Sequence, residues 1–196
     1  MLNDVAITDA LLAIVAGVEG FRLLSSSRGG PTAGVGLLMV ALAAGFGALR
    51  FTIAPDLEMT HQGVTRLASQ VGFPMVGVGW LNSLVWPEHA RQGRAYAFVT
   101  FVLLAIAFIG NPFFGTIMAA LGMAAVVVGA VGLGRHDAWG VTIGIAGALG
   151  VVGSGLLVNG SGSWGPFTRV AWFHLGLAAS CWALAFGLRR VLGRLA

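Results

Sequence analysis

The chain has 196 residues, of which 57% are apolar and only 9% are charged. Its mean hydropathy of +0.89 is too high for a water-soluble globular protein of this length, so the composition excludes a soluble enzyme or a soluble binding domain. All eleven basic residues are arginines, and the formal net charge is +4. No basic segment is interleaved with aromatic residues, so nucleic acid is not an expected partner.

Apolar stretches long enough to cross a bilayer recur along nearly the whole chain. Crossing the hydrocarbon core, about 30 Å thick, takes roughly 20 helical residues. We therefore predict an all-α fold, a polytopic transmembrane helix bundle in which residues 1–196 form a single transmembrane domain. Seven spans are expected, at about 5–24, 33–53, 64–86, 94–110, 113–133, 138–158 and 167–188.

The first span lies where a secretory signal would lie. It has no basic segment before its apolar part and carries Asp4, Asp9 and Glu19, so we interpret it as a retained helix. Glu19 and Arg22 have the spacing of an ion pair on a helix surface. Pro74 lies inside the third span and predicts a kink there.

The distribution of arginine predicts the orientation of the chain. When the loops are assigned alternately to the two sides of the membrane, three arginines fall on one side, Arg50, Arg66 and Arg169, and the other eight fall on the opposite side. Because cytoplasmic loops carry the excess of basic residues, we expect the N-terminus outside and the C-terminus in the cytoplasm. The expected location is the bacterial inner (cytoplasmic) membrane.

Glycine is abundant in the sixth span, and this pattern indicates close helix packing. Small residues at three- and four-residue spacing let helix backbones approach each other inside a membrane. A phosphate-binding glycine loop is not expected, because that motif needs a strand before it and a helix after it. The expected partners are membrane lipids and partner transmembrane helices, in a homo-oligomer or a larger complex. The glycines are Gly140, Gly144, Gly147, Gly150, Gly153 and Gly155.

Polar residues at membrane depth are costly and are therefore candidate functional residues. In this chain they lie mostly toward the outer side, where they could line one polar pocket that binds a ligand. Alternatively, Asp9 could pair with Arg50 or Arg169 and fix the packing of the helices. His61 belongs to the adjoining outer loop. The candidate ligand-binding residues are Asp9, Arg50, Arg66, Gln70, Arg169 and His174.

His174, early in the last span, is the first candidate for a catalytic base, followed by Asp9. Three interpretations stay open: a packed and hydrogen-bonded side chain, a contact to a ligand or substrate, and a ligand to a metal or pigment. Cys181 shares its helix face, but Val170 and Ala178, one turn to either side, cannot bind a metal. We expect His174 to face the interior of the bundle.

Cofactors are not expected. The other histidines, His61, His89 and His136, fall in loops, so a bis-histidine haem has no second ligand at membrane depth. The chain contains no lysine, which excludes a retinal Schiff base. With a single cysteine there is no disulfide within the chain and no thiolate metal cluster.

The span count, the orientation, the acidic first helix (AITDALLAIV) and the histidine early in the last helix resemble the CREST superfamily, which includes alkaline ceramidases and adiponectin-type receptors. The resemblance implies a zinc site with ligands from the second, third and seventh helices. The second-helix positions correspond to Phe46 and Arg50, the third-helix acid to Gln70 or Arg66, and the last pair to His174 with Val170 or Ala178. One ligand out of five remains, so no metal is expected.

Two functions follow from these observations. The first is a non-catalytic accessory subunit of a membrane complex that binds lipids or partner helices. The second is a membrane-embedded enzyme resembling a lipid hydrolase, with an outer-leaflet polar pocket around His174. An ion-coupled transporter is disfavoured because no carboxylate is expected near the middle of the membrane.

Overall fold

The computed structural model describes residues 3–85, 87–111, 113–158 and 162–195. Most of these residues are helical, and the only sheet among them is a two-stranded antiparallel hairpin. The helices are α1 (Asp4–Leu24), α2 (Gly30–Thr52), a 3₁₀ turn (Pro55–Leu57), α3 (Glu58–Leu67), a π-helical turn (Ala68–Gly72), α4 (Phe73–Asn82), α5 (Pro87–Ala107), α6 (Phe114–Leu133), α7 (Ala138–Gly153), a second π-helical turn (Ser154–Val158) and α8 (Arg169–Leu195). The hairpin strands are β1 (Ser163–Trp164) and β2 (Phe167–Thr168).

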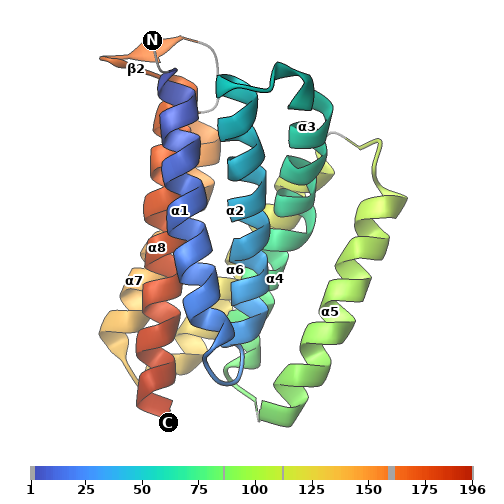
Figure 1. Ribbon diagram of the computed structural model, residues 1–196. Coiled ribbons are helices and arrows are strands. Elements are labelled where there is room, and N and C mark those ends of the chain that lie inside the picture. Colours follow the sequence, from blue (N-terminus) through green and yellow to red (C-terminus); the bar gives the residue numbers. More distant parts are fainter. Residues whose placement is uncertain (1–2, 86, 112, 159–161, 196) are drawn as a thin grey trace.

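The long helices run side by side along one bundle axis, as Figure 1 shows. The third of them is continuous from Glu58 to Asn82, because α3, the π-helical turn and α4 follow one another without a break. Helix α1 packs between α2 and α8, α7 packs on α8, and α6 packs on α4, while α5 lies at the edge against α4. The two chain ends lie at opposite ends of the bundle, which we call the N-terminal end and the C-terminal end.

Four helices are long and apolar enough to cross a membrane. The prediction of an all-α protein with several membrane-spanning helices is therefore confirmed. Helix boundaries differ from the predicted spans mainly where a segment with polar residues continues the helix, as at the end of α8 and at the start of α5. The four helices are Gly30–Thr52, Phe114–Leu133, Ala138–Leu156 and Arg169–Leu195.

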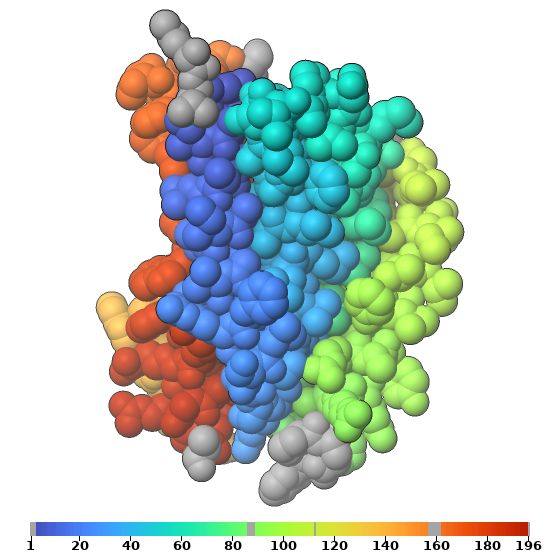
Figure 2. Space-filling view, in the orientation of Figure 1, coloured from blue at the N-terminus to red at the C-terminus, as the bar shows by residue number. Residues whose placement is uncertain are grey.

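Large apolar side chains cover much of the exterior of the bundle. Helices α1, α2, α3 and α5 form most of the face shown in Figure 2, with α8 visible along one edge. On α1 the exposed apolar residues recur at helical spacing, while Asp9 and Glu19 are buried on the opposite side. This inside-out distribution is typical of a helix that faces lipid. The exposed residues are Ile7, Leu11, Ile14, Val18 and Phe21.

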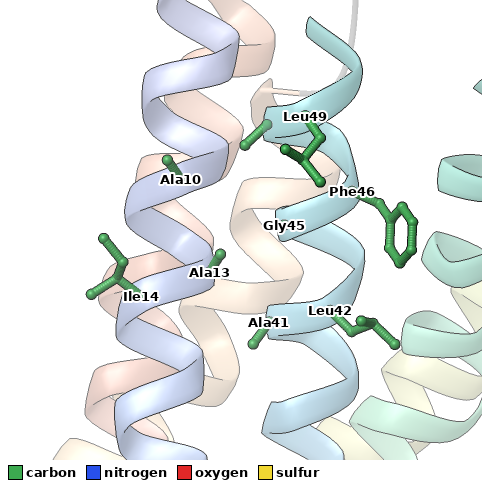
Figure 3. Close-up of a pocket in the computed structure, with 9 residues that line it drawn as sticks. Ala10, Ala13, Ile14, Ala41, Leu42, Gly45, Phe46 and Leu49 are labelled. Atoms are coloured by element: carbon green, nitrogen blue, oxygen red, sulfur yellow. The ribbon is translucent and has the colours of Figure 1, made fainter. Parts of the chain in front are cut away.

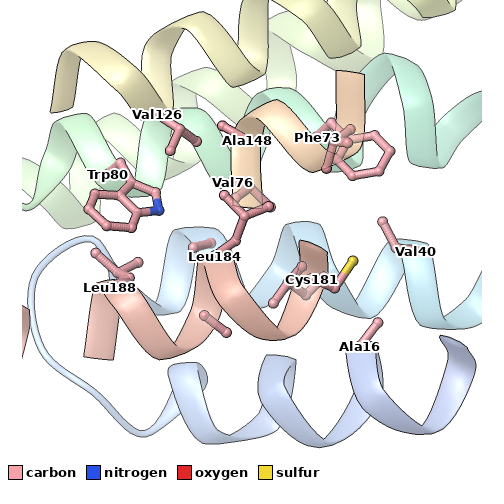
Figure 4. Packing of buried hydrophobic residues seen from close by; sticks show 14 of the residues in the cluster. Ala16, Val40, Phe73, Val76, Trp80, Val126, Ala148, Cys181, Leu184 and Leu188 are labelled. Atoms are coloured by element: carbon pink, nitrogen blue, oxygen red, sulfur yellow. The ribbon is translucent and has the colours of Figure 1, made fainter. Parts of the chain in front are cut away.

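The core includes Trp80 of α4, which is fully buried (Figure 4). A Cβ atom placed on Gly144 of α7 would collide with the indole ring, and one on Gly129 of α6 would lie 2.8 Å from the Trp80 backbone. Gly187 of α8 lies directly against the backbones of Gly140 and Gly144. The close helix packing predicted for the sixth span is therefore present, and it joins helices of the same chain.

Pro74 lies at the start of α4, directly after the π-helical turn. Proline has no N–H group to donate and crowds the preceding turn of a helix. The N–H of Phe73 reaches back five residues to the carbonyl of Ala68, so the helix continues with one wider turn. The irregularity predicted at Pro74 takes the form of a π-helical turn.

Candidate functional site

The site is built around Asp9 of α1 and His174 of α8. The Nδ1 atom of His174 lies 3.2 Å from Oδ1 of Asp9. Their side chains are 12% and 2% exposed, so the pair belongs to the interior of the bundle as expected for His174. The orientation of the two groups does not meet the geometry of a hydrogen bond, and Oδ2 of Asp9 has no partner among the described residues.

His61 of α3 completes this cluster. A Cβ atom placed on Gly47 of α2 would collide with Oδ2 of Asp9 and would lie 2.9 Å from Cε1 of His61, so both side chains lie close to this glycine. The Nδ1 atom of His61 lies 3.2 Å from the carbonyl oxygen of Ala43. Because a carbonyl can only accept, this nitrogen carries the hydrogen and Nε2 is left as the acceptor of the neutral ring.

His61, expected in the outer loop that adjoins the polar residues, lies in a helix instead. Residues Glu58–Leu67 form a helix with an exposed outer face, and His61 lies on the side that faces α2. The His61 ring also makes an edge contact with the ring of Phe51 in α2.

The ends of α1 and α8 are fixed to each other just beyond the cluster. The side chain of Asn3 caps α1 by accepting from the N–H of Val5. The N–H of Thr168, at the end of the hairpin, donates to Oδ2 of Asp4 over 2.7 Å. This hydrogen bond lowers the pKa of Asp4. The contact holds the first turns of the two helices in register, and Asp9 and His174 lie one to two turns further along.

The predicted pairing of Asp9 with an arginine was wrong. Arg50 instead forms an ion pair of 3.1 Å with Glu58, at the junction of α2 and α3. The guanidinium of Arg169 lies 5.1 Å above the ring centre of Trp164 in the hairpin. Both arginines therefore contact residues other than Asp9, although Nε of Arg169 is buried without a hydrogen-bond partner among the described residues.

Arg66 and Gln70 do not join the cluster either, so the six predicted residues do not converge into one pocket. Arg66 is exposed on α3. Gln70 is 5% exposed in the π-helical turn, where it lies near Gly115 at the start of α6. Of the predicted site residues the structure brings together only Asp9 and His174, and it adds His61.

A second buried acid, Glu19, lies toward the C-terminal end of α1. Its Oε1 atom accepts from Arg22 over 2.9 Å, which confirms the ion pair predicted from their spacing. Its Oε2 atom lies 2.8 Å from Arg189 of α8. Glu19 is therefore compensated by two arginines, whereas the contacts of Asp9 are with histidine.

The side chains of this cluster, Asp9, His61 and His174, are of types that can bind a metal ion. Among the described residues, no group of three or more His, Cys, Asp or Glu side chains is placed to hold a metal ion. Cys181 lies about two turns after His174 on α8 and is fully buried in the apolar core. The absence of zinc and haem stays a prediction that elemental analysis can check.

No family model, no curated protein and no solved structure matches this chain. The resemblance to the CREST superfamily therefore stays a prediction.

Proposed function

We propose that this chain is a seven-pass protein of the bacterial cytoplasmic membrane, with its N-terminus outside, and that it acts as a non-catalytic subunit that binds a partner transmembrane helix. Four of the helices meet the requirements of length and apolarity by themselves. The remaining three passes are α1, the continuous helix Glu58–Asn82 and α5. The proposal rests on which side chains face the lipid and which face the interior.

Helix α1 supports its own pass by the direction of its side chains. Its exposed apolar stripe runs from Ile7 to Phe21, and at a rise of about 1.5 Å per residue this covers most of a hydrocarbon core. Its two central acids, Asp9 and Glu19, face α8 and are paired there. The number of charged residues alone would exclude α1 as a membrane-spanning helix, but its acids Asp9 and Glu19 do not face the lipid.

The distribution of arginine supports the orientation. Eight of the eleven arginines belong to the C-terminal end of the bundle, and only Arg50, Arg66 and Arg169 to the N-terminal end. A cytoplasmic C-terminal end satisfies the positive-inside rule.

A groove between α1 and α2 is the surface that we assign to the partner helix (Figure 3). It has a volume of about 470 Å³, and all nine residues that line it are apolar. Small residues from both helices form part of it, so a helix backbone could approach closely. By contrast, the glycines of α7 pack mainly against α8 and Trp80. The lining residues are Ala10, Ala13, Ile14, Ala41, Leu42, Gly45, Phe46, Ala48 and Leu49.

Gly45 allows a sharp test of this assignment. A Cβ atom at Gly45 has nothing within 4 Å, so Gly45→Leu should narrow the groove without disturbing the bundle. Gly153 of α7 is equally open, and Gly153→Leu is the matched control. The measurement is native mass spectrometry of the protein extracted in mild detergent and of both variants.

We expect a stoichiometric partner on the wild type and on Gly153→Leu, and its loss from Gly45→Leu. A partner held equally by all three proteins would place its binding site elsewhere. A phospholipid retained in the groove in place of a protein would show that the occupant is lipid.

One observation favours the second candidate, a lipid hydrolase-like enzyme. A carboxylate beside an imidazole, as in Asp9 and His174, is the arrangement that orients a general base. The close contact of Asp9 and His61 with Gly47 leaves little space beside the carboxylate for a substrate. Release of fatty acid from defined lipids by the wild type, abolished in a folded His174→Gln variant, would establish the enzyme and contradict the non-catalytic subunit.

A further inference from the structure

The buried pair of Asp9 and His174 differs from the other ion pairs of the bundle in how its charge is balanced. Glu19 contacts two arginines and Asp137 contacts Arg190, and arginine keeps its charge at any relevant pH. Histidine is a cation only after it takes up a proton. The charge of the Asp9 pair therefore depends on the number of protons that it holds.

The burial of the pair favours a single shared proton. With no titratable proton the pair carries an uncompensated negative charge at 2% exposure, and with two protons it carries a positive one. Either state is costly in an apolar interior. With one proton the pair is neutral overall, as either a protonated acid beside a neutral ring or an ion pair. The two groups should then titrate together.

The second oxygen of Asp9 is available to accept that proton. Oδ2 is buried, has no hydrogen-bond partner among the described residues, and points to Gly47. A buried acceptor without a donor is rare in a folded protein, because it loses its hydration without replacement. A proton bound at this oxygen removes the charge that makes its burial unfavourable.

His61 lies close to this oxygen and next to the exposed surface of α3. Its neighbours Thr60 and Gln62 are exposed, whereas its Cε1 atom and Oδ2 of Asp9 both approach Gly47. Since Nδ1 donates to Ala43, Nε2 keeps a free lone pair that can take up a proton and release it. This placement makes His61 the connection between the pair and water.

The other charged groups at this end of the bundle do not neutralise the Asp9 carboxylate in place of a proton. Arg50, from α2, is paired with Glu58, from α3. Arg169, from α8, lies over Trp164, and Asp4, from α1, accepts from the backbone of Thr168. No fixed cation among the described residues forms an ion pair with Asp9.

We propose that Asp9 and His174 form a proton-binding site that holds one exchangeable proton, either on the carboxylate or on the imidazole, and that this proton is exchanged with water through His61. Uptake transfers a proton from hydronium in the water to His61, and from there to the Asp9–His174 pair. No bond other than those of the proton is made or broken. The site is independent of whether the chain binds a partner helix.

The test is a pH titration of the full chain in lipid nanodiscs. Infrared difference spectra report protonation of the carboxyl group, and ¹⁵N spectra of histidine-labelled protein report the imidazoles. The variants are Asp9→Asn and His174→Gln, which keep the shape of each side chain. The matched control is His136→Gln, because His136 is exposed at the C-terminal end of the bundle.

We expect a carboxyl signal and the His174 signal to change over the same pH range, with uptake of about one proton per chain. Asp9→Asn should remove the carboxyl change and move the His174 change to a different pH, whereas His136→Gln should alter neither. His61→Gln should keep the joint titration but slow the protonation after a pH jump more than about tenfold.

The proposal is overturned if Asp9 and His174 titrate independently, or if His174 keeps one protonation state across the range in which the protein is folded. If Asp9→Asn does not fold, the titration of the wild type still tests the proposal. The variants His174→Gln and His136→Gln then assign the imidazole signals, so that the His174 signal can be compared with the carboxyl signal. An unchanged rate in His61→Gln would contradict the route through His61.

Discussion

Glu19 of α1 and Arg189 of α8 form an ion pair of 2.8 Å toward one end of the same two helices that Asp9 and His174 join toward the other. The two helices run in the same direction, and each contact involves a buried acid of α1. Helix α8 is thus attached to α1 at two levels by polar contacts, with apolar residues such as Ala16 and Cys181 in the core between them.

We expect Glu19→Gln to destabilise the bundle. The substitution keeps the size of the side chain but leaves Arg189 and Arg22 without the charge that compensates them. Because the acid is buried and both arginines are partly exposed, the loss should be about 1–3 kcal/mol. Unfolding of the purified protein by a denaturing detergent measures it. Arg194→Gln, at an exposed residue, is the control and should change little.

Gly144→Ala should also destabilise the protein, because its new methyl group would collide with the ring of Trp80. Overpacking of a filled core costs about 1–3 kcal/mol. Gly153→Ala has open space around the added methyl, so it should be neutral or slightly stabilising by helix propensity. Equal stability of the two variants would show that the ring can move away at no cost.

The contact of Asp4 with Thr168 predicts a dependence on pH. The hydrogen bond from the backbone lowers the pKa of Asp4 below its ordinary value of 3.8, so the folded state favours the carboxylate. Its contribution to stability is therefore complete above pH 3.8 and is lost as the pH falls through the lowered pKa of the folded state. Asp4→Ala should be less stable than the wild type at neutral pH, with a difference that shrinks in acid.

Asp56 provides the control for that titration. It is exposed in the 3₁₀ turn after α2, so Asp56→Ala should not change the stability at either pH. A difference between Asp4→Ala and the wild type that stays constant as the pH falls would show that the Asp4 contact does not depend on charge.

Much of the fold was predictable because lipid imposes simple requirements. The apolar lengths located most helix ends to within about three residues, and Pro74 lies beside the irregular turn, but polar segments moved the start of α5 to Pro87 and the end of α8 to Leu195. The hairpin at Ser163–Thr168, with its contact from Thr168 to Asp4, was not predicted. Such a contact joins positions far apart in the chain, and periodicity carries no information about it.

The candidate site was only partly predictable. Asp9 and His174 stand out because each is polar within an apolar run. His61 does not, because the segment around it is polar, and only the packing of α3 on α2 brings its ring to Gly47. The pairing of Asp9 with an arginine, one of the two expected arrangements, is not formed because Arg50 and Arg169 contact Glu58 and Trp164 instead, and such long side chains can leave the interior.

The orientation in the membrane can be tested through the single cysteine. Cys181 is fully buried, so the wild type should not react with a membrane-impermeant thiol reagent. In a Cys181→Ala background, Thr60→Cys and His136→Cys place one exposed thiol at each end of the bundle. Since the arginine excess predicts a cytoplasmic C-terminal end, Thr60→Cys should be labelled in intact cells, and His136→Cys only after the membrane is permeabilised. Labelling of both in intact cells would contradict the predicted number of passes, because an odd number must separate the two ends. The reverse pattern would keep the passes and invert the protein, and the Asp9 pair would then exchange its proton with the cytoplasm.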